Sequence, residues 1–410
     1  MNSTGKKFSL IILYIILMTF AFTTNYGDVV VNKNVQYIIA IIIIFVSFFN
    51  FISQYKNKEN ISYLNCFFKM YFIPPLLIHL YTIALMLIGI VDSAYFSTNI
   101  SMYIPILLAL SSVHMFKENA FKYNLIALIF SWLLSILSSI ASKGINIIPY
   151  AIMQGYFGIS NSEWGINKNY FELHDLILSL GCVLVYFIYY KNVKEKLSKK
   201  QIYIILLILI ILALGIKRIT ILGVLIAFVF IKCIKHISKE KKIKACKLIG
   251  IMILIVCYIY IYILFNSNVL YEFCAKHNIN LMGRDYYYDA IVTQGKFSVN
   301  FLGLGRNSVT KILTEQYEYL HVGGVHSDIL KSYMENGFVV FGLWLWYYLI
   351  KITKTYAKKF DILSAVLYFS LTIYTFALYF TDNVENYFIY QIFYIVIPST
   401  YAIKQQKSKK

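Results

Sequence analysis

Arginine is rare in this chain, and each copy falls where an anionic substrate could be bound. The sequence has 35 lysines but only three arginines, Arg218, Arg284 and Arg306. A guanidinium group stays charged and holds phosphate oxygens with two parallel hydrogen bonds, whereas lysine offers a point charge. Arg218 follows Lys217 in a turn between two apolar tracts, ILALGI and ITILGVLIAF. A cation there either marks a ligand or ion path or reaches toward lipid head groups.

The stretch LMGRDYYYDAIVTQGKFSVNFLGLGRNSV (281–309) combines the other two arginines with a pair of glycines. Arg284 is predicted to begin a short helix. Gly303 and Gly305 flank a leucine just before Arg306, and they predict a tight turn whose backbone N–H groups can approach an anion. A Gly-x-Gly pattern indicates a nucleotide site only between a strand and a helix, and the sequence lacks that context here.

The stretch GGVHSDILKSYMENG (323–337) places a histidine at the start of an expected helix. Ser327 or Asp328 is predicted to cap this helix, which runs to Glu335 before the closing glycine ends it. Because histidine ordinarily changes protonation state near neutral pH, His326 is a candidate general base. The alternative is that His326 only caps or packs.

A further polar segment, NKNYFELHD (167–175), precedes another apolar tract. Glu172 and Asp175 are three residues apart and would share a helix face, with His174 between them. Substrate contact and helix capping are equally compatible with this pattern.

The elements that must position these residues are apolar helices. The chain has 410 residues, of which 59% are hydrophobic and 14% charged, and its mean hydropathy is +0.66. Uninterrupted apolar tracts of roughly 17–22 residues match the length that a membrane-spanning helix needs. They do not alternate as barrel strands would, so the expected fold is an all-α polytopic membrane protein. About twelve spans are expected, at 8–24, 35–53, 70–91, 100–116, 123–141, 171–190, 201–215, 219–234, 248–265, 337–350, 362–380 and 387–403.

Lysine placement predicts the orientation. Most basic residues fall in alternate connections, which puts both termini in the cytoplasm and attributes the net charge of +19 to topology, not to nucleic-acid binding. Two outer connections are long, 142–170 and 266–336, and long loops are usually functional. The expected organisation is therefore helices one to nine over 1–265, a large extracytoplasmic loop over 266–336, and the last three helices with a basic tail over 337–410.

Together these stretches resemble the Wzy-type O-antigen and capsule polymerase family and its relatives, the O-antigen ligases. The resemblance covers about 218–342. Lys217 departs from the family pattern, which often has serine before the arginine. The matching residues are Arg218, Phe301, Leu302, Gly303, Leu304, Gly305, Arg306, His326, Ser327, Leu330, Glu335, Gly337 and Gly342.

The resemblance implies a GT-C-like glycosyltransferase in the bacterial cytoplasmic membrane, with its active site on the extracytoplasmic face. Donor and acceptor would be oligosaccharides linked to undecaprenyl pyrophosphate, with no metal, nucleotide sugar or other cofactor. A flippase and a chain-length regulator would be partners. Cations stabilise the departing pyrophosphate and a base takes the proton of the acceptor hydroxyl. The expected catalytic residues are His326, Arg218 and Arg284, and the expected substrate-binding residues are Lys217, Arg306, Gly303, Gly305, Glu335, Glu172 and His174.

Four alternatives remain open. A ligase would transfer the finished glycan to a different acceptor by the same chemistry. A flippase or transporter would show charges within its spans and inverted repeats, whereas His79 is the main polar exception within the expected spans. A metal-dependent transferase would use paired acids such as Asp285 and Asp289. A peptidoglycan polymerase would need an acidic motif that the sequence does not show convincingly.

Overall fold

The structure is a computed structural model, and its described residues are helical or lie in turns and irregular segments, with no strand among them. The expected all-α class is therefore confirmed. The chain forms two compact units, unit 1 (Met1–Phe68, Ser101–Lys235, Tyr387–Lys410) and unit 2 (Lys69–Ile100, His236–Asn386). The division after residues 265 and 336 that the sequence predicts is based on membrane topology and not on compact units, and it stays a prediction. The described residues are 3–23, 33–53, 58–91, 102–157, 170–194, 196–266, 272, 274, 276–277, 284–315 and 324–408.

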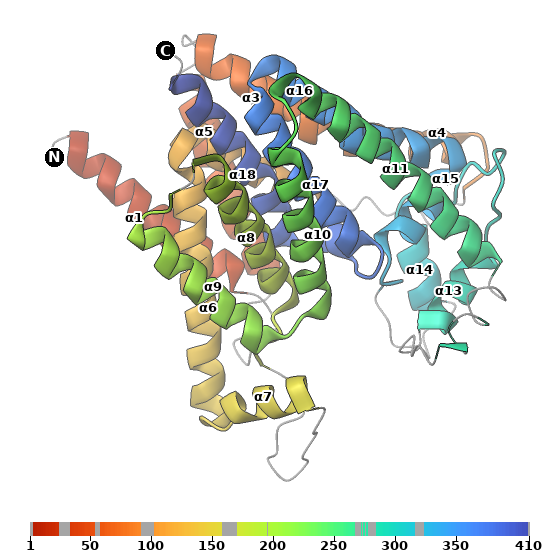
Figure 1. Ribbon diagram of the computed structural model, residues 1–410, viewed down its shortest axis with the longest axis horizontal. Coiled ribbons are helices and arrows are strands. Elements are labelled where there is room, and N and C mark those ends of the chain that lie inside the picture. Colours follow the sequence, from red (N-terminus) through yellow and green to blue (C-terminus); the bar gives the residue numbers. More distant parts are fainter. Residues whose placement is uncertain are drawn as a thin grey trace. The chain divides into compact units, whose positions relative to one another are not determined.

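Unit 1 is built around the C-terminal helix. Its helices are α1 (Ser3–Phe22), α2 (Lys33–Ser53), α5 (Tyr103–Phe116), η3 (Lys117–Asn119), α6 (Ala120–Lys143), α7 (Ile147–Phe157), α8 (His174–Lys194), α9 (Lys199–Gly215), α10 (Arg218–Lys235) and α18 (Phe388–Lys407). Helix α18 packs against α5, α6 and α8, and nearly all its residues from Phe388 to Ile403 are buried (Figure 1). A helix that is apolar on all sides belongs in a core. Helix α7 lies within the expected outer connection 142–170, of which 158–169 is outside the described residues.

Unit 2 is organised by α11 and α15. Its helices are α4 (Ile73–Leu87), α11 (Lys239–Phe265), α13 (Arg284–Val292), α14 (Ser308–Glu315), α15 (Asp328–Trp346), η6 (Tyr347–Lys351), α16 (Ile352–Lys359), α17 (Ile362–Tyr379) and η7 (Val384–Asn386), while α3 (Lys58–Tyr71) runs across the boundary between the units. Helix α15 packs against α4, α11 and α14. Arg284 is the first described residue of α13, and Ser327 is the N-cap of α15, accepting from the Leu330 N–H.

The sequence predicts that a helix ends at Gly337, whereas the structure has a break inside α15 at this residue. Gly337 has φ 72° and ψ 176°, after which the helix resumes as far as Trp346. The part before the break differs from an amphipathic surface helix, because every residue from Asp328 to Gly337 is buried. Polar residues of this part therefore have protein neighbours.

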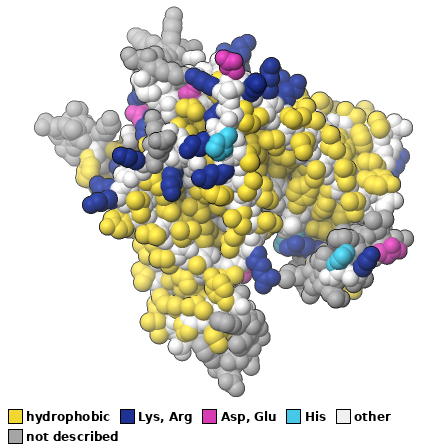
Figure 2. Space-filling view, in the orientation of Figure 1, with side chains coloured by type: hydrophobic (Ala, Val, Ile, Leu, Met, Phe, Trp, Pro, Cys, Tyr) yellow, Lys and Arg dark blue, Asp and Glu magenta, His cyan; other side chains and the backbone are white. Residues whose placement is uncertain are grey.

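The helices include several that are suited to crossing a membrane. Among the described residues, five helices are long and apolar enough, and the pair Ser62–Tyr71 and Ile73–Leu87, bent by 42°, would make a sixth. The five are Asn34–Ser53, Tyr103–Lys143, His174–Val193, Lys239–Phe265 and Ile362–Tyr379. Hydrophobic side chains cover much of the visible surface (Figure 2), as expected of a protein that contacts lipid. The number twelve and the sides on which the termini lie stay predictions.

Candidate active site

The segment 301–306 is joined to α15 by backbone hydrogen bonds within unit 2. The break at Gly337 interrupts the helical pattern, so carbonyl groups of the preceding turn need other partners. The three bonds are Leu304 N–H to Met334 O (2.8 Å), Gly305 N–H to Glu335 O (2.9 Å) and Phe338 N–H to Phe301 O (2.9 Å). Two stretches that the sequence marks as functional therefore form one local structure.

Glycine is required where these stretches meet. Gly303 and Gly337 have φ angles of 93° and 72°, in the left-handed region that other residues rarely adopt. Gly305, with φ 83°, uses its N–H group for α15. The structure thus gives Gly303 and Gly305 a role in joining two segments, while their contact with a substrate stays a prediction.

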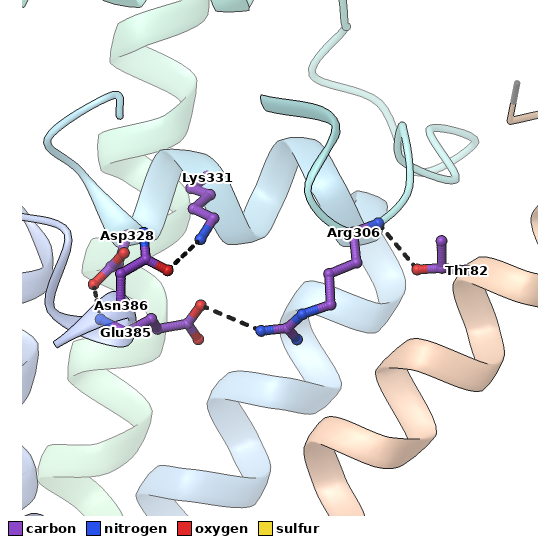
Figure 3. A network of polar contacts seen from close by, with 6 residues as sticks. All are labelled: Thr82, Arg306, Asp328, Lys331, Glu385 and Asn386. Atoms are coloured by element: carbon purple, nitrogen blue, oxygen red, sulfur yellow. Dashed lines mark hydrogen bonds and ion pairs between the residues drawn. The ribbon is translucent and has the colours of Figure 1, made fainter. Parts of the chain in front are cut away.

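Arg306 is held at both ends. Its backbone N–H donates to Thr82 Oγ1 at 3.0 Å, and its Nη2 lies 4.0 Å from Glu385 Oε2. The Arg306 and Glu385 side chains are only 15% and 19% exposed. Figure 3 shows the Arg306 side chain extending toward the Glu385 carboxylate. A cation in so restricted a solvent environment acts more strongly on a nearby anion than one at an open surface.

The turn that follows α17 fixes the beginning of α15. Asp328 Oδ2 accepts from the backbone N–H of Glu385 at 2.8 Å, and Lys331 Nζ donates to Asn386 Oδ1 at 3.3 Å (Figure 3). The Asp328 N–H donates in turn to the Asp382 carbonyl at 3.2 Å. The 380–386 turn therefore belongs to the same network as Arg306.

Two carboxyl groups of α15 are buried with an oxygen that no described residue hydrogen-bonds, Oδ1 of Asp328 and Oε1 of Glu335. Burial, and next the negative charge of Glu385, raises the pKa of Asp328 well above its ordinary value. Burial also raises the pKa of Glu335, although Lys331 and Arg306 oppose that shift. Desolvation disfavours the charged form of an acid, so this site favours bound protons.

His326 directly precedes the start of α15, and hydrogen bonds join that start to α13, the helix that carries Arg284. His326 is half-buried with φ 50°, directly before the N-cap Ser327. Ser327 Oγ accepts from the Tyr260 hydroxyl at 3.3 Å, and Tyr260 is hydrogen-bonded to Tyr288. The charge of Arg284 acts on both tyrosines. A series of hydrogen bonds from Tyr288 through Tyr260 to Ser327 thus joins α13 to the residue beside the candidate base.

Unit 1 holds a separate polar group. Lys217 Nζ lies 2.6 Å from His174 Nδ1, and His174 Nε2 lies 3.2 Å from Glu172 Oε1. A lysine ammonium only donates, so Nδ1 accepts and the imidazole proton is on Nε2, facing the carboxylate. Arg218 begins α10 as an exposed side chain. Three predicted residues, Glu172, His174 and Lys217, are therefore in direct contact.

Unit 2 contains the remaining predicted residues, Arg284, Gly303, Gly305, Arg306, His326 and Glu335, and a backbone hydrogen bond joins Gly305 to Glu335. Sequence reasoning missed Thr82, Lys331 and Glu385 as members of this site. The sequence pattern that could have indicated Glu385 is TDNVEN (381–386), a polar turn between two strongly apolar tracts on the expected outer side. Within the described ranges, no group of three or more His, Cys, Asp or Glu side chains could hold a metal ion.

Comparisons with known proteins identified no relative. No protein-family model, curated protein or solved structure matches the chain.

Proposed function

We propose that the protein is a glycosyltransferase of the bacterial cytoplasmic membrane that polymerises oligosaccharide units linked to undecaprenyl pyrophosphate on its outer face. The observation that carries this proposal is the backbone pairing of the 301–306 segment with α15. The two stretches carry most of the resemblance to the polymerase family, and their pairing supports the idea that they serve one site.

The reaction would transfer a glycan from the donor lipid to a sugar hydroxyl of the acceptor. The acceptor oxygen bonds to the anomeric carbon, the carbon–oxygen bond to the pyrophosphate breaks, and the lipid pyrophosphate leaves with the electron pair. Fixed cations stabilise that growing charge, which is the role proposed for Arg218 and Arg284, with Arg306 and Lys217 as binding residues.

His326 is the proposed base that takes the proton of the acceptor hydroxyl. Its backbone conformation is fixed beside the capped start of α15, where the Tyr260–Ser327 hydrogen bond restrains the adjoining residue. A restrained base loses less entropy on reaching its reactive geometry.

The test is the length distribution of surface glycan in cells that carry His326→Ala or Arg218→Ala in place of the normal protein. Membrane abundance is measured by blot, and His236→Ala, on the expected cytoplasmic side, is the matched control. Collapse to single repeat units with the protein still present would support the proposal. Long chains that stay on the carrier lipid would indicate a ligase, and an unchanged ladder would refute both proposed residues and favour a transporter.

A further inference from the structure

We propose that unit 1 binds an anionic phospholipid in the slot between α8 and α9, with an acyl chain in the slot and the phosphate at Lys191. The proposal is independent of the function proposed above. It follows from the shape, lining and charge of one cavity.

The slot has the chemistry of an acyl-chain site. Its volume is about 450 Å³, within the usual range of ligand sites. Buried Leu184 and Phe187 of α8 line it together with exposed Ile202 and Leu206 of α9. From Leu184 to Lys191 the slot follows α8 for about 10 Å, at 1.5 Å per residue.

The charge is concentrated at one end. Lys191 lines the slot in the last turn of α8, where an extended lysine can pack its methylene groups on apolar surface and keep its ammonium in the polar region. The connection to α9 adds exposed Lys196, Lys199 and Lys200. A capping box of Ser198 and Gln201 fixes the start of α9, which keeps these lysines near the end of α8. Figure 2 shows Lys and Arg side chains over the end of unit 1 where α9 begins.

A second groove in unit 1 shows why charge decides the occupant. It lies between α1 and α6, has a volume of about 670 Å³, and is lined by apolar side chains and Thr19. Any lipid tail could fill it. The α8–α9 slot is smaller and ends at lysines, so it complements a lipid with a negatively charged head group. The positive-inside rule places these lysines at the cytoplasmic leaflet, away from the expected outer-face substrate.

The experiment is native mass spectrometry of the detergent-purified full chain with phosphatidylglycerol or phosphatidylcholine of the same acyl chains. The wild type should retain phosphatidylglycerol preferentially. Lys191→Gln should weaken that preference about fivefold, the effect of one lysine near an anionic surface. Lys122→Gln removes an exposed lysine of α6 that lines neither cavity, and it should leave the preference unchanged.

A pair of slot-filling variants separates this site from general lipid binding. Leu206→Trp should abolish the preferred phosphatidylglycerol adduct, whereas Leu134→Trp in the α1–α6 groove should preserve it. Equal retention of the two lipids by the wild type would overturn the proposal. It would also be overturned if Lys191→Gln kept the full preference for phosphatidylglycerol over phosphatidylcholine. Displacement of phosphatidylglycerol by undecaprenyl pyrophosphate would also overturn it, because the slot would then belong to the carrier lipid.

Discussion

Gly303 and Gly337 lie backbone against backbone. A Cβ added at Gly303 would be 2.5 Å from the Gly337 nitrogen and 2.6 Å from the Glu335 carbonyl oxygen. A Cβ at Gly337 would meet the backbone of Phe301, Leu302 and Gly303 in turn. Both obstacles are backbone atoms, which cannot rotate away as a side chain does. This close approach explains why two distant glycines occur in the two stretches that resemble the polymerase family.

The first prediction concerns this contact. Gly303→Ala and Gly337→Ala should each lower the free energy of unfolding by about 3 kcal/mol, because backbone strain and a backbone clash add. Gly89→Ala is the control, since Gly89 has φ 73° but nothing within 4 Å of its added Cβ. It should cost about 1 kcal/mol, the strain alone. Thermal unfolding in detergent measures all three, and equal losses would show that the close approach does not matter.

Local chemistry made part of this site predictable. The cap at Ser327 and the interruption at Gly337 both follow from residues whose effect extends over one helical turn. Gly337 breaks α15 without ending it. The 301–306 segment donates hydrogen bonds to carbonyl groups that the break leaves without helical partners, and apolar residues continue beyond the break.

The rest of the site depends on distant partners. Thr82 and Arg306 are 224 positions apart, and no local pattern pairs them. Lys331 would face solvent in an isolated amphipathic helix, but the 380–386 turn covers it through Asn386. Sequence periodicity assigns helix faces, whereas tertiary contacts decide which polar face becomes buried.

The second prediction is a pH dependence set by Asp328. Its pKa is raised above the ordinary 3.8, mainly by burial and then by Glu385, with Asp382 adding and Lys331 opposing. The folded state therefore holds this proton more tightly than the unfolded state. The contribution of Asp328 to stability is fully present below pH 3.8 and is lost as pH rises through the folded pKa. Asp328→Asn mimics the protonated acid and should flatten that decline.

The measurement is the unfolding temperature of wild type and Asp328→Asn between pH 4 and 9. Glu315→Gln, at a largely exposed carboxyl, is the control and should follow the wild type. At high pH, Asp328→Asn should equal or exceed the wild type. A variant that loses the same stability at every pH would show that Asp328 is charged in the folded protein.

The third prediction concerns Arg306 and Glu385. Arg306→Gln should destabilise the protein by about 1–3 kcal/mol, because it leaves the poorly solvated Glu385 without its cation. Glu385→Gln in the same chain should restore part of that loss. Lys311→Gln is the comparison, since the Lys311–Glu315 pair is more exposed and should contribute about 0.5 kcal/mol or less. A double-mutant cycle measures the coupling energy between Arg306 and Glu385. Strictly additive losses would mean that the 4.0 Å pair does not stabilise the protein.

The fourth prediction concerns the core of unit 1. Asp175 at the start of α8 accepts from the N–H groups of Ile389 and Tyr390, both at 2.8 Å, and so caps α18 from another helix. Asp175→Ala should cost about 2–4 kcal/mol, because two buried backbone donors lose their carboxyl acceptor. Asp361→Ala removes a local cap that accepts from Ser364 and should cost about 1 kcal/mol. Equal unfolding temperatures for the two variants would contradict a special role for Asp175.

The last prediction tests whether the tyrosine path matters for the proposed reaction. Tyr288→Phe keeps a buried ring but removes the hydroxyl that bonds Tyr260, so the connection between α13 and the start of α15 loses one restraint. Loss of one such bond should slow polymerisation about two- to tenfold, seen as shorter surface glycan at unchanged protein abundance. Tyr286→Phe, on the same helix but 68% exposed, should leave chain length unchanged. If both variants shorten the glycan equally, the effect arises from α13 as a whole, and if neither does, the path has no part in positioning the site.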